Sequence, residues 1–216
     1  MVMISLTLPV HADVTLRGRV GAKTIDDDVV IARGTTCRLF GTTIKGNIRV
    51  QRGARLKTFG AKVDGNVQAF DAKLVDLNSS TRVEGDVQGE GTRTIIVRGK
   101  THVAGNVQLT EGSAAGKGKA LMVRKAVIDG DVQAEKSSGK IVAVRNTIDG
   151  NLQIVENRDG PYKIVGNDLK GDLQFFKNQG AGVIIDNRVG GNLQSKENRP
   201  KPVVRNNRVE GDLEVE

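Results

Sequence analysis

Acidic residues recur in small groups whose types and spacing suit metal binding. Asp129 and Asp131 flank Gly130, and Asp149 repeats the position of Asp129 after 20 further residues. If the fold brings these segments side by side, three carboxylates share one patch, and oxygen-rich clusters of that kind bind Ca²⁺. The alternative is a plain solvated acidic face, because a bend at the glycine can aim the carboxylates apart. Asp129, Asp131 and Asp149 are therefore candidate Ca²⁺ ligands.

A second acidic group, Asp64, Glu84 and Asp86, has the same form, and acid catalysis is the other chemistry to consider. Carboxylates on alternate turns of a coil would lie ~9.6 Å apart, close to the separation that inverting glycosidases use. Every regular coil produces that spacing, however. His11 and His102 are distant in sequence, and the chain has no serine elbow, phosphate loop or Cys/His metal set. A non-catalytic role is therefore predicted.

A repeat that covers nearly the whole chain must position these residues. An aliphatic residue, a spacer, a marker that is usually Gly, then Asn or Asp, and a second aliphatic residue recur ten times. The markers stand at 27, 46, 65, 85, 105, 130, 150, 171, 191 and 211, in steps of 19 to 25 residues. A period near 20 residues indicates a solenoid, in which no single unit buries its apolar face alone.

The aliphatic columns identify the unit as a coil of β-structure. Every marker has an aliphatic residue two places before it and another two places after it. A spacing of two with Val and Ile favours strands, and a constant register predicts that like side chains stack inside one tube. We therefore predict an all-β fold, a single-stranded parallel β-helix of about ten coils of ~20 residues, roughly 45 to 50 Å long.

A second apolar run precedes each marker, and Asn residues separate the two runs. Ile141–Val144 is followed by Asn146, and Val183–Ile185 is followed by Asn187. Because Asn tolerates the left-handed backbone conformation, we predict that it forms a corner and that stacked Asn side chains bond along the axis. Polar segments of variable length, such as residues 156–160, are predicted to close each coil as surface loops.

Two polar columns predict hydrogen-bonded ladders. After the marker, Asn and Asp alternate from residue 66 onward, and an Asn between two carboxylates can donate to both and relieve repulsion at a spacing of about 4.8 Å. Three places after the marker, seven glutamines form a column whose amides can bond along the rod. The predicted ladder residues are Asn66, Asp86, Asn106, Asp131, Asn151, Asp172, Asn192, Gln68, Gln88, Gln108, Gln133, Gln153, Gln174 and Gln194.

Residues 13–216 are predicted to form one β-helix domain, because the columns keep their register throughout. The 25-residue step contains the Gly-rich segment 110–119, which predicts a longer surface loop on one coil. Residues 1–12 are apolar and end in a small residue, so they are interpreted as a remnant of a secretory signal or as a first strand. The single Cys37 has no obvious partner and is interpreted as a small core residue.

The strand, Asn corner, strand order of Val183–Gln194 resembles the right-handed parallel β-helix of the pectate-lyase-like superfamily. Its Gly-Asn-Leu-Gln element, and the Glu-Asn-Arg elements, are also similar to repeats of secreted bacterial β-helix proteins of unassigned function. The resemblance covers residues 14–216. It implies a right-handed coil and a secreted or cell-surface location, with a cytoplasmic location as the alternative. The Asn-Thr-Asp, Gly-His-Gly and Arg-Ile-Lys motifs of the pectin hydrolases are absent from this chain.

The charge of the chain predicts affinity for polyanions. Its 33 basic and 25 acidic residues give a net charge of +8, which favours acidic polysaccharide or an anionic cell envelope as partner. Residues 1–108 carry 16 basic and 10 acidic residues, against 17 and 15 in the remainder, so the first half is the predicted surface. The candidates are Arg49, Arg52, Arg55, Lys57, Arg98 and Lys100, and the alternative is a solvated basic face.

Other partner classes are disfavoured. Aromatic residues make up 3% of the chain and Trp is absent, so no base-stacking surface and no sequence-specific nucleic-acid binding are expected. No run of 18 apolar residues is present, so no transmembrane segment is expected.

The last unit predicts head-to-tail self-assembly. It stops inside a strand without a polar cap, and an uncapped coil exposes backbone groups and apolar side chains to another copy. The acidic residues Glu210, Asp212, Glu214 and Glu216 would meet the basic Arg17, Arg19 and Lys23 of a second copy. The alternative is that terminal charges keep the rod monomeric.

These patterns together predict a non-catalytic, exported structural or surface-interaction solenoid that assembles into filaments. The alternative function is a β-helix that binds or degrades polysaccharide through an acidic outer face.

Overall fold

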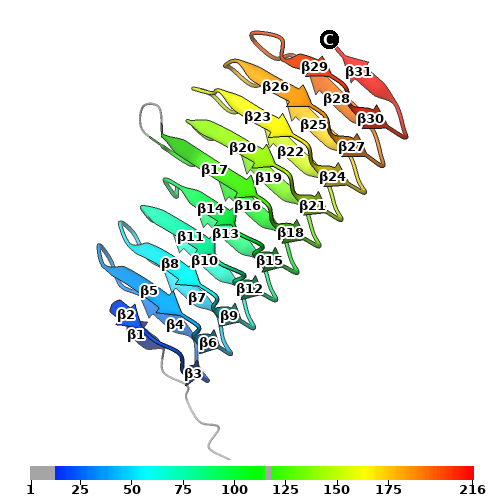
Figure 1. Ribbon diagram of the computed structural model, residues 1–216. Helices are drawn as coiled ribbons and strands as arrows, with labels where there is room; N and C mark the ends of the chain where they lie inside the picture. Colours follow the sequence, from blue (N-terminus) through cyan, green and yellow to red (C-terminus); the bar gives the residue numbers. More distant parts are fainter. Residues whose placement is uncertain (1–12, 115–117) are drawn as a thin grey trace, which may run out of the picture.

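The computed structural model describes residues 13–114 and 118–216 and is a parallel β-solenoid of about ten turns (Figure 1). Each full coil contributes one short strand to each of three parallel sheets, A, B and C, which run the length of the described chain. The predicted all-β fold with coils of about 20 residues is confirmed. The described residues contain no helix, so none is long and apolar enough to span a membrane.

Sheet A has eleven strands and sheet B has ten. The strands of sheet A are β1 (Val14–Leu16), β4 (Val29–Ile31), β7 (Ile48–Val50), β10 (Val67–Phe70), β13 (Val87–Glu90), β16 (Val107–Thr110), β19 (Val132–Glu135), β22 (Leu152–Val155), β25 (Leu173–Phe176), β28 (Leu193–Lys196) and β31 (Leu213–Val215). Those of sheet B are β2 (Gly18–Val20), β5 (Thr36–Phe40), β8 (Arg55–Phe59), β11 (Leu74–Asn78), β14 (Ile95–Arg98), β17 (Lys119–Arg124), β20 (Lys140–Val144), β23 (Tyr162–Val165), β26 (Gly182–Ile185) and β29 (Val203–Arg205).

Sheet C consists of ten two-residue strands. They are β3 (Thr24–Ile25), β6 (Thr43–Ile44), β9 (Lys62–Val63), β12 (Arg82–Val83), β15 (His102–Val103), β18 (Val127–Ile128), β21 (Thr147–Ile148), β24 (Asp168–Leu169), β27 (Arg188–Val189) and β30 (Arg208–Val209).

The aliphatic columns stack in register, as predicted. The column before the marker lies in sheet C, and the column after it lies in sheet A, where Val67 pairs with Val87 and Val87 with Val107. Their side chains are buried in a core of Val, Ile, Leu and Ala, except in the last coil, where Val209 is partly buried and Leu213 is 58% exposed. Cys37 is also buried there, and desolvation raises the pKa of its thiol to about 11, which agrees with its interpretation as a core residue.

The marker glycine lies at the corner where sheet C ends and sheet A begins. A Cβ on Gly65 would lie 2.6 Å from Asn47 Oδ1 and 2.8 Å from the Gly46 carbonyl oxygen, so the close approach is to the preceding coil. Glycine there lets successive coils reach the strand spacing at a sharp corner.

The predicted role of Asn at the corner between sheets B and C needs a correction. The residue in the left-handed conformation is the one before it, as at Arg145 (φ 55°) and Asp186 (φ 56°). Asn146 itself points inward and is 1% exposed. Its Nδ2 donates to the Val123 carbonyl of the preceding coil and to Asn167 Oδ1 of the next, at 2.9 Å each. The stacking along the axis is therefore confirmed.

A second internal Asn ladder lies at the corner between sheets A and B, where surface loops were predicted. Asn157 and Asn178 are fully buried, and Asn198 is 6% exposed. Asn157 Nδ2 donates to Asn178 Oδ1 at 3.1 Å, and Asn178 Nδ2 donates to Asn198 Oδ1 at 3.2 Å. The amides bond to one another and to buried carbonyls, which is why these polar residues can face inward.

The 25-residue step leaves the columns intact, because Val107 pairs directly with Val132 across it. The extra residues lie between β16 and β17, and residues 115–117 of the predicted loop 110–119 are outside the described residues. The predicted signal remnant or first strand, residues 1–12, also lies outside them.

Candidate functional site

The structure does not gather the three predicted Ca²⁺ ligands into one site. Asp129 lies beside His102, whose Nε2 is 2.9 Å from the carboxylate. Asp149 accepts a hydrogen bond of 2.6 Å from Lys170 Nζ, and this contact raises the pKa of Lys170. Both carboxylates therefore face a basic or imidazole group on a neighbouring coil, along the outer edge of sheet C.

Asp131 belongs to the polar column at the next corner. Its Oδ1 accepts the backbone N–H of Asn151 at 2.7 Å and the side-chain amide of Asn151 at 3.1 Å. Across residues 13–114 and 118–216, no group of three or more His, Cys, Asp or Glu side chains is arranged to hold a metal ion. The expectation of one acidic patch is corrected for a geometric reason, since the corner turns Asp131 away from Asp129.

The second acidic group is divided in the same way. Asp64 pairs with Lys62 at 2.9 Å, and Glu84 pairs with Arg82 at 2.5 Å. The hydrogen bond from Arg82 lowers the pKa of Glu84. Pairs of opposite charge thus cover the outer edge of sheet C.

The Asn and Asp column forms the predicted ladder with one difference. Asn106 Nδ2 donates to Asp86 Oδ1 of the preceding coil at 3.1 Å, and Asn106 Oδ1 accepts the backbone N–H of Asp131 at 2.8 Å. The Asn amide therefore donates toward one neighbour only, and the backbone of the following coil supplies the other hydrogen bond. Repulsion is still avoided, because Asn separates successive carboxylates.

The glutamine side chains on the outer face of sheet A form a hydrogen-bonded ladder. Each of its amide-to-amide hydrogen bonds is donated in the same direction, toward the next coil. Each Nε2 donates to the Oε1 of the next coil from Gln68 to Gln174, with distances of 3.5, 3.3, 2.9, 2.8 and 3.0 Å. These distances end at Gln174, and Gln194 makes a separate hydrogen bond from its Nε2 to Glu214 Oε2 of the last coil at 3.3 Å. These amides bond to one another, so this face is occupied by its own hydrogen bonds.

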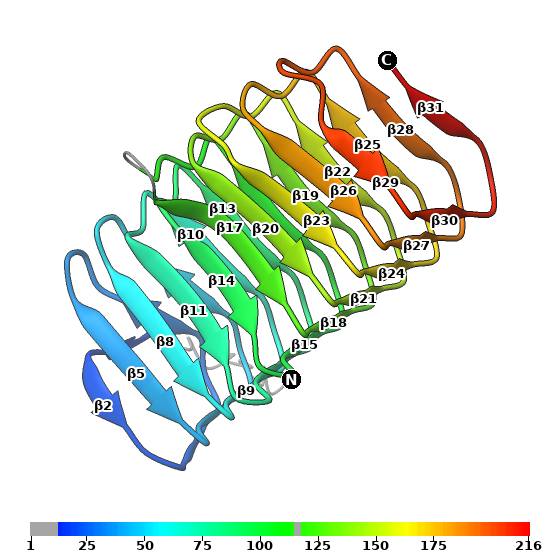
Figure 2. The same cartoon turned by 45° about the horizontal axis from the view of Figure 1, so that its top comes forward.

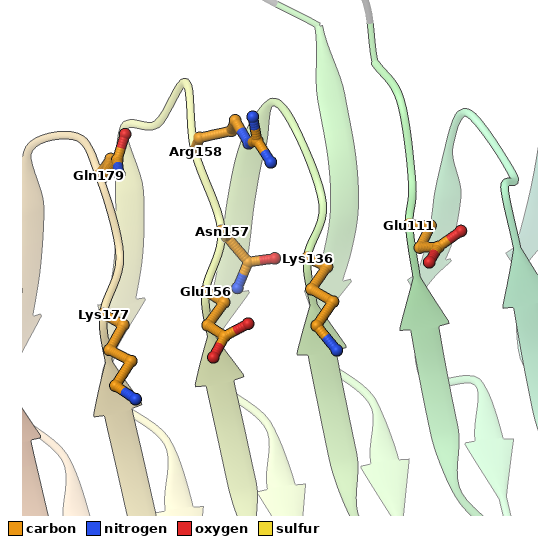
Figure 3. Close-up of a pocket in the computed structure, with 7 residues that line it drawn as sticks. All are labelled: Glu111, Lys136, Glu156, Asn157, Arg158, Lys177 and Gln179. Carbon is orange, nitrogen blue, oxygen red and sulfur yellow. The ribbon is translucent and has the colours of Figure 1, made fainter.

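A shallow groove follows the corner between sheets A and B (Figure 3). Glu111, Lys136, Glu156 and Lys177 stand there on successive coils in the left-handed conformation, with φ between 49° and 56°. The hydrogen bond from Lys136 to Glu135 raises the pKa of Lys136, and the charges of Glu156 and Glu111 act in the same direction. Because the charges alternate in sign, the groove favours neither an anion nor a cation.

The six predicted polyanion-binding residues lie on different parts of the surface. Arg49 is on the outer face of sheet A, where its guanidinium lies 3.1 Å from Asp13 and 3.7 Å from Asp28. Arg52 lies in the turn after β7, and Lys100 in the corner after β14 with φ of 64°. These three do not form one surface.

The other three lie on the outer face of sheet B. Arg55 and Lys57 are on the same strand, β8. Arg98, on β14, donates from Nε and Nη2 to the buried Asp76 at 3.1 and 3.0 Å. Arg55 and Lys57 are therefore the part of the predicted set that the structure brings together.

Two more cations and two aromatic rings lie beside Arg55 and Lys57 and were not predicted to belong to this surface. Arg19 and Arg38 are in register with Lys57, which makes a row of three basic residues on consecutive coils. Phe40 and Phe59 stack with centroids 4.8 Å apart, and the Arg19 guanidinium lies 4.1 Å from the Phe40 ring. The steps of 19 residues from Arg19 to Arg38 to Lys57 equal the local coil length, so the signal was present.

The later coils of sheet B carry a surface of another kind. The six strands β14, β17, β20, β23, β26 and β29 contain no Asp or Glu. We call their outward side chains the apolar–basic face. In register, one row is Ile96, Met122, Val142, Lys163, Val183 and Val203, and the other is Arg98, Arg124, Val144, Val165, Ile185 and Arg205.

The cations of sheet B are less neutralised than those of the other faces. Along the edge of sheet C, basic side chains pair with acidic ones, as in Lys45 with Asp26 and Arg188 with Glu210. Within the described ranges, the one ion pair on the apolar–basic face is that of Arg98. Figure 2 shows the strands of sheet B side by side along the rod. The outward cations of the later strands therefore lie on one face, with aliphatic side chains between them.

Comparison with protein-family models, with curated proteins and with solved structures gave no match. The candidate site therefore rests on the geometry of this chain.

Proposed function

We propose that this chain is a non-catalytic, exported, rigid scaffold that binds anionic surfaces through the outer face of sheet B. The observation that carries the proposal is the row of Arg19, Arg38 and Lys57, together with the cations of the apolar–basic face farther along the same sheet. Partners of matching chemistry are acidic polysaccharides and the anionic cell envelope.

Rigidity supports this function. Hydrogen-bonded ladders join successive coils through the Asn side chains at two internal corners, through the Asn and Asp column, and through the glutamines of sheet A. Cations on a sheet held in this way keep a spacing of about 4.8 Å. An array ordered before binding engages a polymeric anion at many points with little further loss of conformational freedom.

Export and kinship with the pectate-lyase-like superfamily are part of the proposal. They rest on the resemblance of Val183–Gln194 to that superfamily, on the solenoid, and on the apolar character of residues 1–12. The alternative of an acidic polysaccharide-binding or polysaccharide-degrading wall has less support. Asp129 and Asp149 already have partners of their own, as described above.

Binding to dextran sulfate, a soluble acidic polysaccharide, tests the function. We expect Arg38→Gln combined with Lys57→Gln to weaken binding by about tenfold or more, because two cations of one row are lost. Lys62→Gln combined with Arg208→Gln removes the same charge from sheet C and is the matched control. Equal losses in the two double variants, or no binding by the unaltered chain, would reject sheet B as the binding surface.

Head-to-tail assembly into filaments remains a prediction. Glu210, Asp212 and Glu214 would face Arg17 and Arg19 of a second copy, so association should weaken as salt screens the charges. Sedimentation velocity at rising protein concentration and two salt concentrations, with electron microscopy for filaments, tests it. A species of 23.1 kDa that persists at high concentration would count against assembly.

A further inference from the structure

The apolar–basic face combines two chemistries that the other faces separate. Its central side chains are aliphatic, with Val142, Val144, Val165 and Ile185 half-buried and Val203 52% exposed. Cations lie around and among them. Monomeric proteins seldom expose a contiguous apolar patch without a binding role, so this arrangement calls for a partner.

Basic and apolar side chains of this face line one surface depression together. A shallow depression of about 390 Å³ is lined by four cations and four apolar side chains. These are Lys119, Arg124, Arg145, Lys163, Met122, Val142, Val144 and Val165. A ligand that fits it has an anionic group for the guanidinium and ammonium groups, and hydrocarbon for the aliphatic side chains.

A second copy of the chain is a poor occupant of this face. A symmetric dimer built on one patch sets that patch against itself. Arg124, Lys163 and Arg205 would then approach the same cations of the other copy, without carboxylates on the six strands to balance them. Like charges brought together in this way destabilise the contact.

A purely polar polyanion would also leave the aliphatic side chains of this face without a partner. A sulfated or carboxylated polymer would satisfy the cations, but it offers little apolar surface to the row of valines. Protein interfaces usually rely on aromatic anchors, and the outward positions of the six strands are aliphatic or basic. An anionic bilayer presents phosphate above hydrocarbon, and aliphatic burial and cation attraction add together there.

We infer that the apolar–basic face docks onto an anionic lipid surface, with Arg124, Lys140, Lys163 and Arg205 at the phosphates and the Val, Ile and Met side chains at the acyl boundary. This inference rests on the proposed function and names its partner. Six adjacent coils make the docking strip roughly 24 Å long.

Co-sedimentation with vesicles is the first test. We expect binding to vesicles of phosphatidylcholine mixed with phosphatidylglycerol and little binding to phosphatidylcholine alone. Arg124→Gln combined with Lys163→Gln should lower the partition coefficient about thirtyfold, because two cations near an anionic surface are lost. Lys62→Gln combined with Arg208→Gln should leave it nearly unchanged, and circular dichroism confirms that each variant is folded.

Val144→Thr combined with Val165→Thr separates lipid docking from simple charge attraction. Threonine keeps the shape and the strand preference of valine but exchanges a methyl group for a hydroxyl. We expect a loss of about tenfold on anionic vesicles and no change on dextran sulfate. An equal loss on both probes, or no loss on vesicles, would overturn the role of the aliphatic rows.

A site-specific probe identifies the face that meets the lipid. Cys37 is 0% exposed, so Val142→Cys provides one accessible thiol for an environment-sensitive dye. We expect a blue shift of its emission on anionic vesicles. The matched label at Thr147→Cys, on the outer side of sheet C, should show none. A shift at Thr147→Cys alone would reject this orientation.

The outcomes distinguish the two proposals. Binding to dextran sulfate without binding to anionic vesicles overturns the lipid inference and leaves the proposed function standing. Binding to neither overturns both. Binding to polyglutamate that is lost with the two threonines, without vesicle binding, would assign the face to an acidic protein instead.

Discussion

Asp76 marks the point where the outer face of sheet B changes character. In its row it follows Arg19, Arg38 and Lys57 and precedes Ile96. The Asp76 side chain is 7% exposed, and the two hydrogen bonds from Arg98 compensate its carboxylate. A carboxylate this buried needs such a partner, because its charge is poorly solvated.

Arg98→Ala should lower the free energy of unfolding by about 2 kcal/mol, since it leaves the Asp76 carboxylate buried and unpaired. Because Arg98 is partly exposed, the expected loss of stability is small for a broken buried ion pair. Adding Asp76→Asn should recover much of the loss, because the buried charge is removed. Urea denaturation of the two single variants and the double variant measures this coupling, and strictly additive losses would contradict it.

The buried thiol of Cys37 makes the free energy of unfolding depend on pH in the alkaline range. Burial raises the pKa of its thiol from 9.0 to about 11, so the folded state favours the protonated form. Its contribution to stability is complete below pH 9.0 and declines as the pH rises toward about 11, where the folded thiol ionises. Thermal melts between these pH values should show a steeper decline for the unaltered chain than for Cys37→Ala. Parallel declines would show that other groups, Tyr162 among them, are responsible.

At the scale of the coil, its three corners are built from different residues. The corner between sheets B and C uses buried Thr81 and Thr101 in earlier coils and Asn146, Asn167 and Asn187 in later ones. Each asparagine bonds to the coil on either side. Thr81 and Thr101 each donate to a carbonyl three residues earlier in their own coil, and Thr81 also bonds to Thr58 Oγ1 of the preceding coil at 2.8 Å. The later coils are therefore joined by more side-chain hydrogen bonds at this corner.

Gly65→Ala should lower the free energy of unfolding by about 2 to 3 kcal/mol. The added Cβ would meet the side chain of Asn47 and the backbone of Gly46, and backbone cannot move aside without disturbing both sheets at the corner. Gly21→Ala is the matched control, because nothing lies within 4 Å of a Cβ there. Chemical denaturation compares the two variants, and equal stabilities would refute the close approach of coils at the marker.

The whole molecule is a stack in which each strand pairs only with its equivalents in the coils before and after it. Such a solenoid gains stability coil by coil, through interfaces between neighbours. Its three faces differ, with an amide ladder on sheet A, charge pairs along sheet C, and cations with aliphatic side chains on sheet B. A rigid rod with one open face suits surface attachment.

Deleting residues 131–150 removes one complete coil and joins Gly130 to Asn151. We expect a folded, shorter solenoid, because Gln108 then meets Gln153 and every aliphatic row closes in register. Deleting residues 141–150 instead breaks the register and should abolish cooperative unfolding. Circular dichroism during thermal unfolding measures both, and comparable transitions would contradict a coil-by-coil architecture.

The repeat by itself determined the strands, the coil length and the buried columns. A constant step lays like residues over like, so Val67, Val87 and Val107 had to share a row once one coil was placed above another. The glutamine ladder follows for the same reason. The 19-residue step from Arg38 to Lys57 held the same information about the cationic row.

Only the tertiary structure decided which way each corner turns its side chains. Asp129 and Asp131 are neighbours across a single glycine, yet one faces His102 on the outer edge and the other bonds within the polar column. From the sequence, Asn157 looks like any residue of a surface loop. In the structure its Nδ2 donates a hydrogen bond to Asn178 Oδ1 of the next coil, which identifies it as part of a buried ladder. The direction in which a corner turns its side chains depends on how the three sheets close around one core. Packing between neighbouring coils sets that closure, and the sequence of a single repeat does not contain it.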